Sequence, residues 1–132
     1  MLDHIFLSVR DLDRSVGFYR RALEPLGIAN LHDYDGSSGP AGHPDLKGFG
    51  AGGRMFFWLR QGATDGRAVH VGFVADSVAT VDAAYAAAIE AGARDNGAPG
   101  ARTYYDPRYY AANVLDPDGY SIEFVYKSWQ HD

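Results

Sequence analysis

The chain has no cysteine, no long apolar run and no surplus of basic residues. The absence of cysteine excludes disulfides, thiolate nucleophiles and cysteine-bound zinc, so nitrogen and oxygen must supply any metal ligands. No segment approaches the ~18 apolar residues of a membrane-spanning helix. Because 17 acidic residues oppose 12 basic ones, the net charge is -5, which argues against nucleic acid as the main partner.

The remaining composition is that of an ordinary soluble domain. A length of 132 residues corresponds to one domain. Residues 1–4 lack the basic region and the apolar core of a signal peptide. Together with the absence of cysteine, this start favours a cytoplasmic location.

One pattern occurs twice along the chain. A shift of 65 positions places Gly27 on Gly92, and it places residues 55–59 on residues 120–124. Each copy is predicted to run strand, helix and then about three strands, of which the middle ones are the least clearly marked.

In the first copy, alternating residues over Leu2–Val9 predict a strand. Asp11 is suited to cap the helix that follows, and Pro25 with Gly27 ends it. The segment Arg54–Arg60 predicts the last strand of this copy.

The second copy has the same order. Its helix is predicted to begin at a cap formed by Asp76 or Ser77. The segment Asp116–Gly119 carries Asp, Pro and Gly at the positions that a type I turn prefers. This turn is predicted to join strands near residues 110–115 and 120–126.

These elements predict an α+β fold. Each module, about residues 1–62 and about residues 67–127, has a sheet with one face covered by its own helix. The other face needs a partner, so two βαβββ modules are expected to form a cupped, barrel-like mixed sheet with the helices outside.

Three potential metal ligands fall on the concave side of this cup. In each first strand the apolar residues form the helix-facing set, which turns His4 and His70 to the other face. The same alternation in the last strand turns Glu123 inward. Two imidazoles and a carboxylate with open positions form the facial triad of a mononuclear site for one divalent ion, and Fe, Mn, Ni, Co and Zn are all compatible.

Each of these residues alone has an ordinary interpretation. A single histidine in a strand is usually a hydrogen-bonded or surface residue, and a single glutamate is usually solvated. Their joint position at repeat-related sites favours a metal site. The fourth related position, opposite Glu123, carries Trp58, which cannot bind metal.

Further candidates surround this site. Phe56, Trp58 and Arg60 share a strand face and are expected to line the cup against a small-molecule substrate, although plain core packing is the alternative. Tyr109 and Tyr110 could act as an acid or an oxyanion donor, or could be structural or lie at a subunit contact.

A segment rich in turn residues, from Gly36 to Gly42, interrupts the first copy. It could be a lid. The polar residues in or near it are more typical of a solvated loop, as His131 is of a tail; those residues are His32, Asp33, Asp35 and His43.

Three segments resemble the vicinal oxygen chelate superfamily, which includes glyoxalase I, bleomycin-resistance proteins and extradiol dioxygenases. They are His4–Leu12, His70–Phe73 and, most specifically, Leu115–Glu123. In the metal-dependent members, the residues that match His4, His70 and Glu123 are ligands.

The resemblance also narrows the function. Glyoxalase I usually has a fourth ligand at the position of Trp58, so a typical glyoxalase I is not expected. The resemblance implies a metal-dependent dioxygenase-like or isomerase/lyase-like enzyme. The alternatives are a metal-free, ligand-sequestering protein and a thiol-transferring antibiotic-resistance enzyme. It also implies a homodimer, in which His4 of one chain could meet His70 and Glu123 of the other.

Overall fold

The computed structural model describes residues 2–132, in which two α-helices, α1 (Leu12–Leu23) and α2 (Val78–Glu90), accompany two β-sheets. The strands are β1 (Ile5–Val9), β2 (Asn30–Tyr34), β3 (Leu46–Ala51), β4 (Arg54–Gln61), β5 (His70–Val74), β6 (Arg94–Asp95), β7 (Gly100–Ala101), β8 (Tyr109–Leu115) and β9 (Ser121–Lys127). Three short 3-10 helices are η1 (Glu24–Leu26), η2 (Gly36–Ser38) and η3 (Ser128–His131). Over this part of the chain, no helix has both the length and the apolar character needed to cross a membrane.

The two sheets have the same strand order. The first sheet runs β1-β4-β3-β2, and the second runs β5-β9-β8-β6, with β7 also paired to β8. In each sheet the first pair is parallel, β1 with β4 and β5 with β9, and the remaining pairs are antiparallel. The predicted α+β fold of two βαβββ modules is therefore confirmed.

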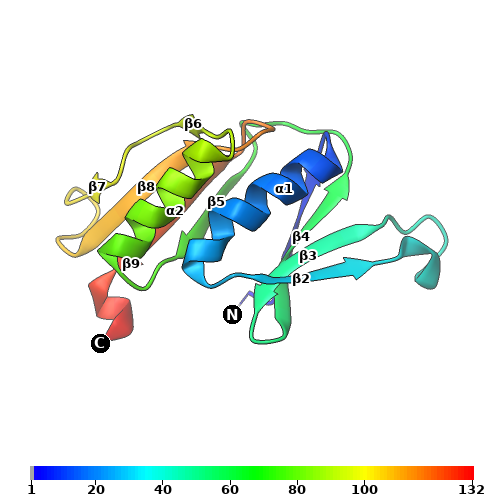
Figure 1. Cartoon of the computed structure of the whole chain (residues 1–132), viewed down its shortest axis with the longest axis horizontal. Helices are drawn as coiled ribbons and strands as arrows, with labels where there is room; N and C mark the ends of the chain where they lie inside the picture. Colours follow the sequence, from blue (N-terminus) through cyan, green and yellow to red (C-terminus); the bar gives the residue numbers. More distant parts are fainter. Residues whose placement is uncertain (1) are drawn as a thin grey trace.

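The two sheets remain separate, and no barrel closes within residues 2–132. Figure 1 shows the two helices side by side on one side of the molecule, with the strands of the first module spread to the right and those of the second to the left. One chain thus supplies two open sheets, and neither covers the concave face of the other.

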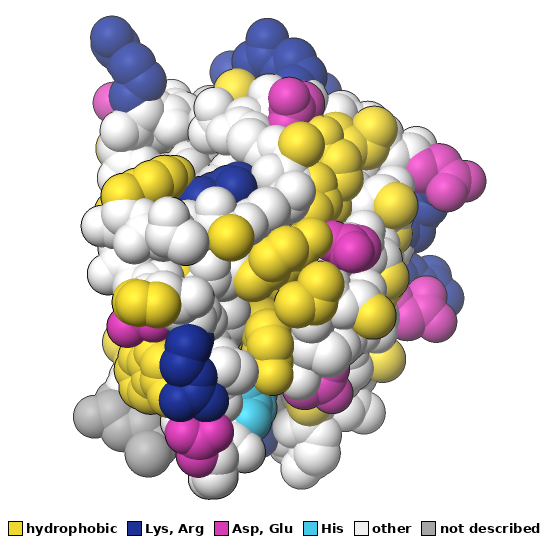
Figure 2. All heavy atoms as spheres, turned by 90° about the vertical axis from the view of Figure 1, so that its left-hand side faces the viewer, with side chains coloured by type: hydrophobic (Ala, Val, Ile, Leu, Met, Phe, Trp, Pro, Cys, Tyr) yellow, Lys and Arg dark blue, Asp and Glu magenta, His cyan; other side chains and the backbone are white. Residues whose placement is uncertain are grey.

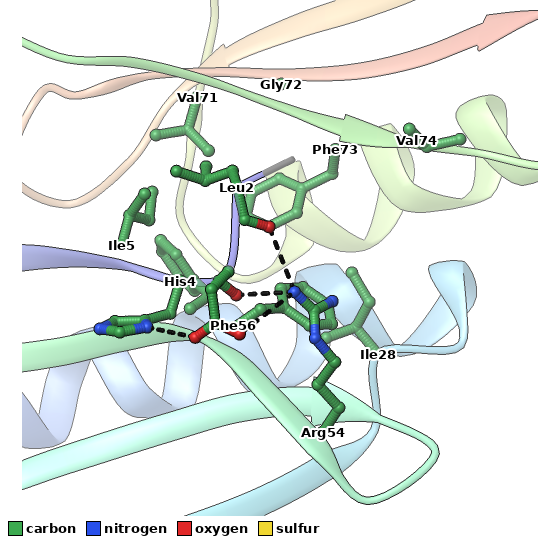
Figure 3. Close-up of a pocket in the computed structure, with 12 residues that line it drawn as sticks. Leu2, His4, Ile5, Ile28, Arg54, Phe56, Val71, Gly72, Phe73 and Val74 are labelled. Atoms are coloured by element: carbon green, nitrogen blue, oxygen red, sulfur yellow. Dashed lines mark hydrogen bonds and ion pairs between the residues drawn. The ribbon is translucent and has the colours of Figure 1, made fainter.

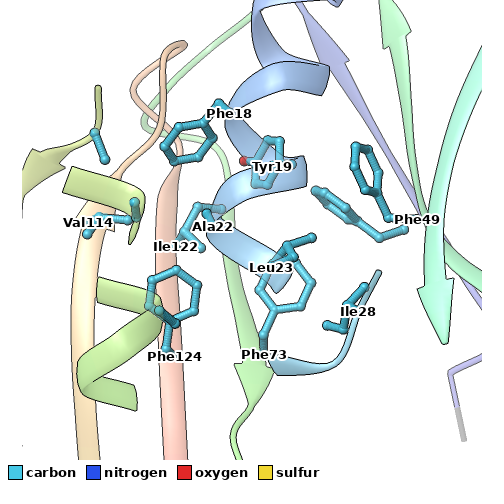
Figure 4. Close-up of a cluster of buried hydrophobic side chains, with 14 of the residues drawn as sticks. Phe18, Tyr19, Ala22, Leu23, Ile28, Phe49, Phe73, Val114, Ile122 and Phe124 are labelled. Carbon is cyan, nitrogen blue, oxygen red and sulfur yellow. The ribbon is translucent and has the colours of Figure 1, made fainter. Parts of the chain in front are cut away.

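A single hydrophobic core lies between the helices and the sheets (Figure 4). The residues that alternation assigned to the helix side are buried, among them Val9 in β1 and Ile122 and Phe124 in β9. The ring of Phe57 packs edge-on against that of Phe73 with centroids 5.2 Å apart, which joins β4 to β5 across the module boundary. Burial of this shared core holds the two modules together.

The helix starts follow their capping residues. The side chain of Asp11 accepts a hydrogen bond from the backbone N–H of Arg14 at 3.1 Å. At the second helix the cap is Ser77, whose hydroxyl accepts from the N–H of Thr80 at 3.0 Å. After η1, Gly27 has a φ of 77°, a left-handed conformation that favours glycine.

The turn Asp116–Gly119 does more than close the β8–β9 hairpin, because its two aspartates dock on the first module. Asp118 accepts from the backbone N–H of Arg10 at 3.0 Å and from the hydroxyl of Ser15 at 3.3 Å. The hydroxyl of Tyr19 on α1 donates to Asp116. We call this set of contacts the turn–helix contact.

The turn–helix contact is buried, with both aspartates and Tyr19 withdrawn from solvent. Burial raises the pKa of Asp116, and the hydrogen bond from Tyr19 opposes that rise. The pKa of the Tyr19 phenol is raised by its own burial and then by the nearby carboxylates, so Tyr19 remains a donor. A buried carboxylate that lost this donor would have no water to replace it.

Replacement of Tyr19 by phenylalanine is expected to lower the free energy of unfolding by about 1–3 kcal/mol, because one oxygen of Asp116 is left buried and unpaired. Chemical denaturation measures the change. Tyr104→Phe is the control, since Tyr104 is 75% exposed and its replacement should change stability by less than about 0.5 kcal/mol. Equal stability of the two variants would contradict the assigned role of the turn–helix contact.

Candidate metal and ligand site

The parallel pairing of β5 and β9 brings His70 next to Glu123. His70 lies opposite Ser121, and Gly72 lies opposite Glu123, so alternation turns both functional side chains to the face away from the helices. His70 Nε2 is 3.1 Å from Glu123 Oε1. At Gly72 an added Cβ would meet no atom within 4 Å, so the space beside Glu123 is open.

Ser121 fixes the orientation of the His70 ring. Its hydroxyl is hydrogen-bonded to His70 Nδ1 at 2.8 Å, which directs Nε2 toward Glu123. A hydroxyl can donate or accept, so it suits either tautomer of the imidazole. This partner on the second ring nitrogen is typical of histidines that bind metals.

Glu123 is held by two donors from β8. The hydroxyl of Tyr109 donates to Oε2, and Asn113 Nδ2 is 3.5 Å from Oε1. Burial, followed by the neighbouring Glu123 carboxylate, raises the pKa of Tyr109, so the phenol keeps its proton. The side chain of Glu123 is 11% exposed and that of His70 is 53% exposed, so the pair opens to solvent on the histidine side.

A groove of about 470 Å³ opens onto this pair. Besides His70, Glu123 and Tyr109, it is lined by Tyr105, Asp106, Lys127 and Trp129. The hydrogen bonds of Tyr109 and Ser121 therefore position two potential ligand atoms at the inner end of a ligand-sized depression.

His4 lies on the other sheet, one residue before β1. Its Nδ1 is 2.5 Å from Asp3 Oδ2, and its ring packs edge-on against Phe6 at 5.8 Å. Figure 3 shows His4 at the border of the hollow between β1 and β5, whose lining includes it. Residues 2–132 contain no group of three or more acidic or histidine side chains arranged to hold a metal, because the two sheets stay apart.

The predicted lining residues lie on the concave side of the first sheet. Phe6 pairs with Trp58 and Ser8 with Arg60, which places these side chains on one face. Arg60 Nε donates to the hydroxyl of Ser8 at 3.1 Å. Trp58 lines a hollow together with His4, and Phe56 lines the hollow between β1 and β5.

The other sequence candidates lie away from the His70–Glu123 pair. The hydroxyl of Tyr110 donates to Asp82 on α2 at 2.7 Å, on the opposite face of β8 from Tyr109. Asp33 forms an ion pair with Lys47 at 2.9 Å. His131 packs against Tyr126.

The polar residues near the turn-rich segment make local contacts. Asp35 accepts from the backbone N–H of Ser37 at 2.8 Å, and the hydrogen bonds to Ser37 lower its pKa. His43 is hydrogen-bonded to the carbonyl of Pro44, and His32 packs edge-on against Trp58 at 6.3 Å. None of these contacts involves the second sheet.

Sequence reasoning turned Ser121 into the cup with Glu123 but gave it no role, and it missed Lys127 and Trp129. The alternation along β9 could have identified Lys127, because Ser121, Glu123 and Lys127 share one face of that strand. Trp129 lies in η3, beyond the strand, and no periodicity marked it.

Two βαβββ modules with the same strand order characterise this chain, with His4 just before its first strand and His70 at the start of β5. The family model that matches residues 1–124 is the Glyoxalase/Bleomycin resistance protein/Dioxygenase superfamily. The chain belongs to this superfamily, which confirms the predicted resemblance.

Solved structures agree with this assignment. A glyoxalase/bleomycin resistance protein from Albidiferax ferrireducens T118 is 27% identical, covering 96% of this chain and 98% of its own, with a TM-score of 0.79. A glyoxalase/bleomycin resistance protein/dioxygenase family enzyme from Burkholderia phytofirmans PsJN is 19% identical. The match covers 95% of this chain and 97% of that one, with a TM-score of 0.68. A glyoxalase/dioxygenase from Nostoc punctiforme is 23% identical. The match covers 96% of this chain and 90% of that one, with a TM-score of 0.65. No curated protein matches the chain.

A change at Gly48 should disturb the concave face of the first sheet. An added Cβ there would lie 2.6 Å from Cζ3 of Trp58, so the indole must move. Gly48→Ala is expected to lower the free energy of unfolding by about 1–3 kcal/mol. It should also shift the emission of Trp58, measured in a Trp129→Phe background that leaves Trp58 as the remaining tryptophan.

Gly72→Ala is the matched control, because it also adds one methyl group in a strand but meets open space. Its stability and emission should stay close to those of the unchanged chain. If Gly48→Ala behaved like Gly72→Ala, the indole would not be packed against Gly48 in solution.

Proposed function

We propose that the chain is a metal-dependent enzyme that binds a small oxygenated substrate at one divalent ion held by His4, His70 and Glu123. The observation that carries the proposal is the 3.1 Å separation of His70 Nε2 and Glu123 Oε1. Two ligand atoms at right angles, each ~2.1 Å from a metal, lie ~3 Å apart. The donor set of two imidazoles and one carboxylate suits Fe, Mn, Ni, Co or Zn.

The third ligand comes from a second copy of the chain. His4 lies on the first sheet, and His70 and Glu123 lie on the second, which is separate from it. Each sheet leaves its concave face uncovered in the single chain, and a homodimer could place the first module of one copy over the second module of the other. Each dimer would then hold two equivalent sites.

The bound ion would polarise a substrate oxygen and stabilise negative charge on it. The residues of this chain prepare the site for that chemistry. Ser121 directs His70 Nε2 toward Glu123, and Tyr109 occupies Glu123 Oε2, which leaves Oε1 as the ligand atom. The protonated Tyr109 phenol is also within reach of a substrate oxygen in the groove.

The reaction is proposed to be dioxygenase-like or isomerase/lyase-like. Trp58 occupies the place where the resemblance expects a fourth, carboxylate ligand in glyoxalase I, and an indole can neither bind metal nor move a proton from substrate carbon. The proposed enzyme is therefore not a typical glyoxalase I.

A second candidate is a metal-free protein that sequesters a ligand in the aromatic groove. The observation that favours it is that the described residues of one chain do not gather three ligands. Metal content separates the two candidates.

Protein purified without chelator is expected to carry about one transition metal ion per chain, measured by elemental analysis. Glu123→Ala should lose it, because a site with two histidines alone lacks the charged ligand. Glu90→Ala, which removes an exposed carboxylate on α2, should keep it. If the unchanged chain stayed metal-free even after reconstitution with each candidate ion, the metal-free candidate would replace this one.

Mixing two inactive chains tests whether the site is shared. In a heterodimer of His4→Ala and Glu123→Ala chains, one site lacks both ligands and the other is intact. A refolded equal mixture should therefore recover about a quarter of the metal sites if chains pair at random. No recovery, with heterodimers shown by mass spectrometry, would mean that each site forms within one chain.

A further inference from the structure

The groove beside the His70–Glu123 pair contains a lysine for which the proposed metal site has no use. The chain has two lysines. Lys47 forms an ion pair with Asp33, whereas the ammonium of Lys127 forms no ion pair with any residue between 2 and 132. What distinguishes Lys127 is its place in the lining of the groove beside His70 and Glu123.

Two aromatic rings hold this cation. Lys127 Nζ lies 5.6 Å from the ring centroid of Tyr109 and 5.1 Å from that of Trp129. Attraction between an ammonium and ring faces keeps the side chain in the groove. The rings do not engage the three N–H donors as a carboxylate would, so these donors remain available to a ligand.

Three aromatic rings in the walls of the groove suit a flat group, and the Asp106 carboxylate that also lines it accepts a hydrogen bond from the backbone N–H of Arg108. Tyr105 packs against Tyr109 with ring centroids 5.2 Å apart, and Tyr104 packs against Tyr105 at 4.7 Å. Tyr105 is 70% exposed. Figure 2 views the molecule from the side that carries β6, β7 and β8, where hydrophobic side chains are exposed between charged ones.

The Tyr109 ring sets the length of the ligand. Its hydroxyl is bonded to Glu123 at one end of the groove, and Lys127 lies over its ring toward the other. An aromatic ring of the same size, laid along Tyr109, would reach both the His70–Glu123 pair and Lys127. Glu123 and Lys127 lie on one face of β9, four residues or ~13 Å apart at their Cα atoms.

We infer that Lys127, held between Tyr109 and Trp129, is an anion subsite, and that the substrate carries a carboxylate or phosphate on an aromatic ring whose other polar end faces His70 and Glu123. This inference names the substrate class of the proposed enzyme. It rests on the proposed function only for the end of the substrate that faces His70 and Glu123. The anion end depends on this chain's own residues and needs no metal.

Calorimetric titration of the purified protein with 4-hydroxybenzoate tests the subsite. The chelator-treated protein should bind this acid, and Lys127→Met should weaken binding about tenfold, the effect of one charge-assisted hydrogen bond. Lys127→Arg should retain most of the affinity. Lys47→Met, which removes the other lysine, should bind like the unchanged chain.

Two further ligands identify what the lysine recognises. The neutral 4-hydroxybenzamide should bind weakly, and its affinity should change less than twofold in Lys127→Met. Phenyl phosphate separates the two anions: tighter binding than 4-hydroxybenzoate would assign a phosphate ester, and weaker binding would assign a carboxylate.

The inference is overturned if the acid does not bind, if Lys127→Met binds it unchanged, or if the amide binds as well as the acid. It is also overturned if Lys127→Met dissociates the dimer, which would make Lys127 a subunit contact. Metal content, measured on the same variants, keeps the two proposals apart. Lysine-dependent binding in a protein that takes up no metal would remove only the proposed metal chemistry, whereas metal uptake without lysine-dependent binding would remove only the anion subsite.

Discussion

The hydrogen bonds between the Asp116–Gly119 turn and α1 are the constraint on which the arrangement of the site depends. Two buried carboxylates from the second module find their donors in the first, at Arg10, Ser15 and Tyr19. Buried carboxylates tolerate no loss of such partners, so the turn can occupy one position only. Strand β9 begins two residues after the turn, and its register with β5 places Glu123 beside His70. Partners within the second module orient His70 and Glu123, whereas the turn joins the hairpin that carries Glu123 to the opposite module.

Alternation and repetition in the sequence predicted much of the strand and helix arrangement around His70 and Glu123. Both strands that carry the ligand pair were expected, and their faces followed from period-two patterning, because a strand that buries one side must turn the other outward. The cap at Asp11 and the final hairpin were also predicted, since each depends on a few neighbouring residues. The adjacency of His70 and Glu123 needed one further assumption, the pairing of the first and last strands of a module, which the repeat alone could not supply.

The relation between the modules could not be predicted from such local patterns. Alternation predicts which face of its own sheet His4 occupies, but it carries no information on which other sheet that face meets. The same limit applies to Tyr109 and Tyr110, which are neighbours in sequence. One donates to Glu123 and the other to Asp82 on α2, because adjacent residues of a strand point to opposite faces.

The two modules carry different side chains at corresponding positions of their sheets. The position that carries Glu123 in the second module carries Trp58 in the first, and this indole packs over Gly48. The second sheet thus has the Glu123 carboxylate together with Tyr109 and Lys127, and the first has Trp58 with histidines beside it. If two such faces meet in a dimer, an acidic and hydrogen-bonding half closes against an apolar half. Closure of that kind would exclude water from the groove beside His70 and Glu123, and the lower local dielectric would strengthen each charged contact that the second sheet supplies.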